Sequence, residues 1–240
     1  EKFNELVSNK VIEKNKHISI RLEKIKFKFD IKNFNLFLET KEPNVIYKNL
    51  KIPIENVKVY LDFISLIKSK PKIDNVNVSS KEVNIDKLKK IILKTKPSNL
   101  NSLITNKIDN GKLIVNLELY FNEDLNIENF IARGEVKEMS GTINPKIDLK
   151  KTSFNFFADP SDVLIKDIKS NLEGILIKNG KIQIKKNNEI NLRSDFTTEI
   201  RINKKNILNF LPIVKNINFI NKETVLSANL DNFLDITFDK

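Results

Sequence analysis

The residue types that carry most enzyme chemistry are nearly absent from this chain of 240 residues. The chain has Cys 0 and His 1, which excludes thiolate nucleophiles, disulfides and zinc–thiolate sites and leaves little for imidazole acid–base catalysis. With Gly 5, the chain also lacks the glycine-rich loops that bind nucleotide phosphates. We therefore predict a non-enzymatic protein with no catalytic residues, no metal and no cofactor.

Two acidic pairs are the remaining candidates for a metal site or for acid–base chemistry. Asp159 and Asp162 flank a Pro-Ser dipeptide, and Glu123 is followed by Asp124. Short acidic side chains beside Pro and Ser are typical of capped turns, because the carboxylate accepts hydrogen bonds from nearby backbone N–H groups. We interpret both pairs as turns, and His17 as an exposed residue at the start of a strand.

The basic charge raises the question of a nucleic-acid partner. Lys+Arg 42 against Asp+Glu 31 gives a net charge of +11. The lysines are spread along many predicted strands instead of forming one patch, and Phe 16 with Tyr 3 and Trp 0 offers few amphipathic rings for stacking on bases. The charge pattern therefore favours a solvated outer face, and we predict no nucleic-acid partner.

A period of two in apolar residues is the dominant pattern, and it predicts strands. From Lys24 to Ile31 every second residue is apolar and the others are charged, which places the two sets on opposite faces of a sheet. About fourteen to sixteen such runs follow one another along the chain. The candidate residues of the apolar face are Ile18, Ile20, Leu22, Ile25, Phe27, Phe29, Ile31, Val57, Val59, Leu61, Val76, Val78, Leu113, Val115, Leu117, Leu119, Phe154, Phe156, Ile175, Ile177, Ile182 and Ile184.

Turn and helix signals divide these runs. Asn179-Gly180 lies between two apolar runs and predicts a hairpin with a two-residue type I′ turn, and Asn110-Gly111 is a second candidate. Residues 86–95 predict a helix with Asp86 as its N-cap, since the apolar residues follow a helical period and Pro97 comes just after. Shorter helices are expected near residues 3–11, 65–68 and 206–211, and loops at 42–44, 96–101, 122–126 and 158–162.

Two architectures satisfy this pattern. One is a closed sandwich, whose two sheets bury their apolar faces against each other; the other is a long, curved sheet whose apolar face stays open. Alternation alone does not separate them, but strand patterns over the whole length favour the second. We predict a mostly β fold, with an elongated, twisted antiparallel sheet forming an open groove and a few short helices. No linker marks a domain boundary, so residues 1–240 are expected to form a single region.

Several segments resemble the AsmA-like family of bacterial envelope proteins. Asn56–Ile67, followed by the run Lys70–Val78, is similar to a strand, turn and strand of that family. Residues 32–54 resemble its N-terminal region, and Phe130–Val136 with Gly141–Ile143 resemble two of its strands. Ile175–Ile184, with Gly174 and Gly180, matches a recurrent pattern of the family. The resemblance covers residues 18–190 and consists of apolar spacing more than of particular side chains.

The resemblance implies a β-groove that carries phospholipid acyl chains between the inner and outer membranes in outer-membrane biogenesis. It implies a periplasmic location, with an inner-membrane helix upstream of Glu1, so that the sequence is expected to be a fragment of a longer anchored protein. Outer-membrane or periplasmic proteins are the expected partners. The alternative function is that of a scaffolding β-domain, which binds a protein partner through its sheet edges.

Overall fold

The structure, a computed structural model, describes residues 17–22, 24–30, 35–61, 73–122, 124, 126–144, 147–172, 175–203 and 225–238. Within these ranges the chain forms fifteen strands and two helices. The predicted fold class is confirmed, because the chain is mostly β, with an open antiparallel sheet and short helices.

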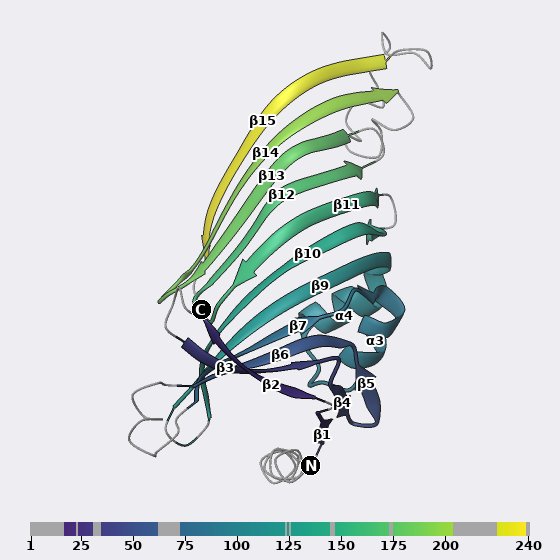
Figure 1. Cartoon of the computed structure of the whole chain (residues 1–240). Helices are drawn as coiled ribbons and strands as arrows, with labels where there is room; N and C mark the ends of the chain where they lie inside the picture. The colour runs from purple at the N-terminus through teal and green to yellow at the C-terminus, as the bar shows by residue number, and fades with distance from the viewer. Residues whose placement is uncertain are drawn as a thin grey trace. The chain divides into compact units, whose positions relative to one another are not determined.

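Most of the strands belong to one large antiparallel sheet (Figure 1). β2 at one edge and β15 at the other are not paired with each other, so the sheet is not closed. Between these edges, neighbouring strands are hydrogen-bonded in the order β15 (Val225–Phe238), β14 (Ile190–Asn203), β13 (Ile175–Lys186), β12 (Asp162–Leu172), β11 (Ile147–Ala158), β10 (Ile127–Asn144), β9 (Ile108–Phe121), β7 (Ile73–Ser80), β6 (Ile54–Leu61), β3 (Asn35–Lys41) and β2 (Ile25–Asp30), and β8 (Val83–Asn84) also pairs with β9.

A second sheet of three strands has the order β1 (Ile18–Arg21), β4 (Asn44–Tyr47) and β5 (Leu50–Ile52). Lys48 and Asn49 join β4 to β5, and both have positive φ, at 45° and 65°. Two successive residues of positive φ are the requirement of a type I′ hairpin turn. Ile18 and Ile20 lie in this small sheet, so their predicted place on the apolar face of the large sheet is wrong.

The helix expected at residues 86–95 is present as α3 (Ile85–Ile92). Its N-cap is Asn84, whose Oδ1 accepts a hydrogen bond from the Lys87 N–H at 3.0 Å, so the prediction of Asp86 as N-cap is wrong: Asp86 lies in the first turn. A second helix, α4 (Asn99–Lys107), begins after Ser98, whose Oγ accepts from the Asn101 N–H at 3.1 Å. The loop expected at 96–101 is therefore wrong for residues 99–101, which form the first turn of α4. The short helices expected near 3–11, 65–68 and 206–211 lie outside the described residues.

Both predicted Asn-Gly turns are wrong, because each dipeptide lies inside a continuous strand. Gly180 is in the middle of β13 and pairs with Phe196 of β14. Gly111 lies in β9 with φ of 150°, where an added Cβ would come 3.3 Å from the Met139 Cα. By contrast, Asp159 does cap a turn: its Oδ1 accepts from the N–H groups of Ser161 and Asp162, both at 2.8 Å.

The chain divides into two compact units. Unit 1 comprises Glu1–Val83, Lys90–Lys96 and Ile114–Arg133, and unit 2 comprises Asn84–Lys89, Pro97–Leu113 and Gly134–Lys240. The division runs through β9 and β10, so each of these strands contributes residues to both units.

One ion pair, between an exposed lysine and a buried carboxylate, joins the polar sides of β2 and β3 in unit 1. Lys28 Nζ lies 2.5 Å from Glu39 Oε2, and the Glu39 side chain is only 7% exposed. The hydrogen bond from Lys28, together with the charges of Lys28, Lys58 and Lys41, lowers the pKa of Glu39 from its ordinary value of 4.5, although burial acts in the opposite direction. The carboxylate is therefore ionised at neutral pH and paired across the strands.

We expect Glu39→Gln to reduce the acid sensitivity of the fold. A carboxyl whose pKa is lower in the folded than in the unfolded state stabilises the fold fully above about 4.5, and this stabilisation is lost as pH falls through the folded pKa. Urea unfolding should show a smaller difference in stability between pH 7 and pH 3 for Glu39→Gln than for the natural chain. An unchanged difference would contradict this role of the ion pair.

Candidate functional site

In unit 1 the strand register places most of the predicted apolar residues on one face of the sheet. Phe27 pairs with Leu38, which pairs with Val59 on the next strand, and Val59 pairs in turn with Val76 and Val76 with Leu119. Directly paired residues share a face. The apolar face of unit 1 therefore consists of Ile25, Phe27, Phe29, Leu36, Leu38, Val57, Val59, Leu61, Val76, Val78, Leu117 and Leu119, and Val115 extends it along β9.

In unit 2 a second apolar face crosses β11 to β15, which lie side by side as curved strands (Figure 1). Phe156 pairs with Ile165, which pairs with Ile182. The apolar face of unit 2 consists of Phe154, Phe156, Val163, Ile165, Ile168, Ile175, Ile177, Ile182, Ile184, Ile190, Leu192, Phe196, Ile200, Leu230, Leu234, Ile236 and Phe238. Leu113 also belongs to unit 2, and Ile31 lies outside the described residues.

Most side chains of these two faces are half-buried. Within the described ranges the buried Leu, Ile and Val side chains are Leu22, Val57, Val83, Ile85, Ile108 and Ile168, and only two of these belong to the apolar faces. On the edge strands exposure rises to 71% for Phe27 and 48% for Phe238. In a closed sandwich the inward side chains of both sheets interdigitate and are buried. The exposure of these faces therefore fits an open apolar surface.

A line of β-bulges crosses four neighbouring strands of unit 2. Glu138 in β10, Lys151 in β11 and Asp167 in β12 all have positive φ, between 50° and 58°. The β13–β14 register shifts by one residue between Ile177 and Asn179. An extra residue in one strand bends that strand and increases its twist, so aligned bulges bend the neighbouring strands at the same level. This line of bulges is called the crease below.

Small residues fill the apolar face of unit 2 at the crease. Thr152 and Ser170 are 3% and 4% exposed, and their hydroxyl groups are 2.6 Å apart in a hydrogen bond. Thr198, which is 8% exposed, accepts a hydrogen bond from the Asn232 amide at 3.1 Å. On the opposite face at the same level, Lys178 and Lys181 are exposed. At this level the apolar face is therefore buried and the opposite face exposed. Because side chains converge on the inner side of a bend, the apolar face is the concave one.

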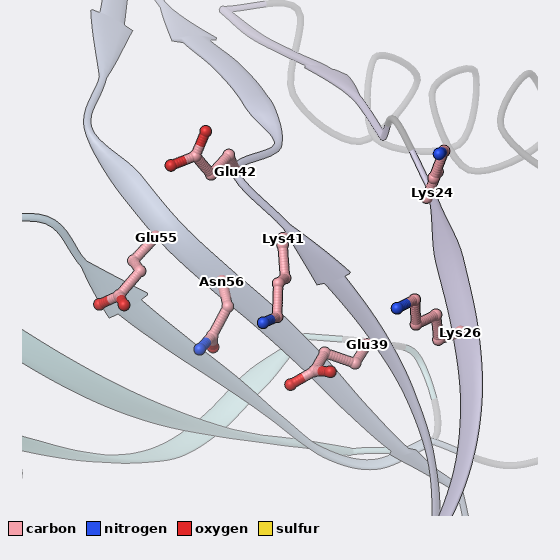
Figure 2. Close-up of a pocket in the computed structure, with 7 residues that line it drawn as sticks. All are labelled: Lys24, Lys26, Glu39, Lys41, Glu42, Glu55 and Asn56. Carbon is pink, nitrogen blue, oxygen red and sulfur yellow. The ribbon is translucent and has the colours of Figure 1, made fainter.

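The opposite faces of both units carry most of the charged side chains and are rich in ion pairs. In unit 2, Lys178 pairs with Glu199 at 2.6 Å and Arg193 with Asp235 at 2.8 Å. In unit 1 this side carries a shallow cavity of about 610 Å³, shown in Figure 2 and lined by Lys24, Lys26, Glu39, Lys41, Glu42, Glu55 and Asn56. A hydrogen bond from Lys81 lowers the pKa of Glu42, as Lys28 lowers that of Glu39. The carboxylates of Glu39 and Glu42 are therefore ionised and paired with lysines. This state favours a hydrated polar surface over a site of proton transfer.

Within the described ranges, no group of three or more His, Cys, Asp or Glu side chains is arranged to hold a metal ion. Across the same ranges, neither helix has the length and apolar content needed to cross a bilayer. The only extended feature that the predicted candidate residues form is the pair of apolar faces.

Comparison with protein-family models, curated proteins and solved structures finds no match to this chain. The resemblance to AsmA-like proteins therefore stays a prediction.

Neither the crease nor several members of the faces were predicted from the sequence. Leu36 and Leu38 belong to a strand that contains Glu39 and Thr40, both buried, so the strand lacks a clean alternation of polar and apolar residues. The bulge residues are Glu, Lys and Asp instead of glycine, and they give no conformational signal. One signal was present: the apolar period changes phase between Ile177 and Ile182. A bulge produces that change as readily as a turn does.

The close approach of Phe196 to Gly180 gives a test of the crease. A Cβ at Gly180 would lie 2.5 Å from Phe196 Cδ1 and 3.1 Å from Ile168 Cβ. We expect Gly180→Ala to destabilise the fold by about 1–3 kcal/mol through overpacking. In a double-mutant cycle, Phe196→Ala should remove part of that cost, because it removes the ring. Purely additive effects in denaturant unfolding would argue against this contact.

Proposed function

We propose that this protein is a non-enzymatic lipid-binding or lipid-transfer module, which holds phospholipid acyl chains against its apolar faces. The observation that carries the proposal is the half-buried state of these faces. Leaving such a surface in water is unfavourable in proportion to its area, so an apolar ligand that covers it gains free energy. Large exposed apolar patches of this kind mark ligand, membrane or protein contact sites.

The chemistry of the faces favours acyl chains over a polar ligand. Their lining is almost entirely Ile, Leu, Val and Phe, and the hydroxyl groups at the crease are hydrogen-bonded to each other or to Asn232. Acyl chains require a continuous apolar wall and no directional hydrogen bonds, while headgroups remain in water. We therefore expect binding to depend on chain length more than on headgroup.

The family resemblance supports the cellular part of the proposal. If the chain is AsmA-like, it acts in the periplasm, is tethered to the inner membrane through an upstream helix, and delivers phospholipid towards the outer membrane. These points rest on the apolar spacing of residues 18–190.

A scaffolding function is the second candidate, and the edge strand β15 favours it. Leu230, Phe233 and Leu234 are 43%, 67% and 47% exposed on this 14-residue strand. A long, exposed edge is a template for another strand, because its backbone groups on that side are available for pairing. Protein that is lipid-free in every preparation, yet pairs with another chain along β15, would favour this function.

A charge introduced on one face of β9 or on the other distinguishes an open, lipid-binding apolar face from a closed core. We expect Leu117→Asp to keep the fold, because an open face lets the carboxylate hydrate, and to lower co-purified phospholipid roughly tenfold or more through the lost apolar contact. Solvent extraction followed by mass spectrometry measures the lipid, and circular dichroism measures the fold. In a closed core the same unpaired charge would unfold the protein.

Asn116→Asp is the matched control, because it adds the same charge one residue away, on the opposite face, where Asn116 is exposed and pairs with Ser79. It should leave both the lipid content and the fold unchanged. Equal lipid content in the folded Leu117→Asp variant and in Asn116→Asp would count against acyl-chain binding at β9.

A further inference from the structure

The C-terminal end of α3 and the β4–β5 hairpin form one surface in unit 1. Lys48 Nζ donates a hydrogen bond to the Lys94 carbonyl oxygen at 2.6 Å, and the Tyr47 hydroxyl donates to the same oxygen at 3.3 Å. Both donors sit at the end of a helix, where backbone carbonyl groups lack partners within the helix. These contacts fix the hairpin beside the last turn of α3.

This surface combines an exposed leucine with lysines. Leu93 is 69% exposed, and Lys90 in the last turn of α3 and Lys94 just beyond its end are exposed as well. Residues 90–98 and 44–52 contain no Asp or Glu, although the whole chain has Asp+Glu 31. We call the set of Tyr47, Lys48, Lys90, Leu93 and Lys94 the Leu93 patch.

We infer that the Leu93 patch docks on the surface of a bilayer that contains anionic phospholipid. Charge complementarity selects the partner, because lysines next to an anionic surface gain electrostatic free energy. The exposed leucine can enter the boundary between headgroups and acyl chains while the stems of the exposed Lys90 and Lys94 extend towards the phosphates. Tyr47 has the apolar ring and polar hydroxyl that suit the same interface.

This inference is independent of the proposed function. Docking at a bilayer does not require the apolar faces to hold lipid, and a protein that carries lipid on those faces can load it without this patch. The two are therefore measured separately, with co-purified lipid reporting on the faces and vesicle binding reporting on the patch.

Vesicle flotation tests the charge component. The probes are phosphatidylcholine vesicles with and without about 30% phosphatidylglycerol. Each lysine at an anionic surface contributes roughly fivefold to partitioning, so Lys90→Gln with Lys94→Gln should weaken binding to the anionic vesicles by roughly tenfold or more. Lys185→Gln with Lys186→Gln removes the same charge from exposed positions on β13 and should change it little. Equal losses in the two double variants would overturn the inference.

A second variant tests the apolar component. Leu93→Ser should weaken binding to the same vesicles severalfold without unfolding the protein, since the side chain is 69% exposed. Leu176→Ser, at a leucine that is 41% exposed in β13, is the control. Binding that is unaffected by Leu93→Ser but lost with the lysines would indicate a general polyanion surface, such as one for nucleic acid, and would overturn membrane docking. Equal binding to vesicles of pure phosphatidylcholine would overturn it too.

Discussion

The two-residue period of the β-strand is the constraint on which the rest of this structure depends. It places most of the Ile, Leu, Val and Phe side chains on one side of the strands and most of the Lys, Asp and Asn side chains on the other. The polar sides carry cross-strand ion pairs such as Lys178–Glu199. The apolar sides are left half-exposed in the described ranges, and this surface is what the proposed function uses.

The crease adds a second constraint in unit 2. Bulges at the same level in β10 to β13 make the apolar face concave, and the small side chains of Thr152, Ser170 and Thr198 are buried at the bend. Their hydroxyl groups are hydrogen-bonded to one another or to Asn232, so they add no unsatisfied polar atom to the apolar face. Gly180 lies under the Phe196 ring for the same steric reason. Bending and apolar lining thus arise from separate sets of residues in the same strands.

The sequence predicted the fold class well, because alternation is a local property. The apolar residues of β2, β6 and β7 share a face as expected, and α3 forms where its apolar spacing predicted, although Asn84 and not Asp86 is its N-cap. Pairing between distant strands is not local: nothing in Ile18 or Ile20 indicates that β1 joins β4 instead of the large sheet. The Asn179-Gly180 prediction failed because a bulge and a tight turn shift the apolar period in the same way.

Adjacent aromatic residues on opposite faces allow the most direct test of an open, lipid-contacting surface. Phe156 pairs with Ile165 on the apolar face, whereas Phe157 pairs with Leu164 on the other face and has Lys166 Nζ 5.0 Å from its ring. Each is replaced in turn by p-benzoylphenylalanine, the producing cells are irradiated, and adducts on the purified protein are identified by mass spectrometry. The account predicts phospholipid adducts at position 156 and none at 157. Equal labelling at both positions, or no lipid at 156, would contradict it.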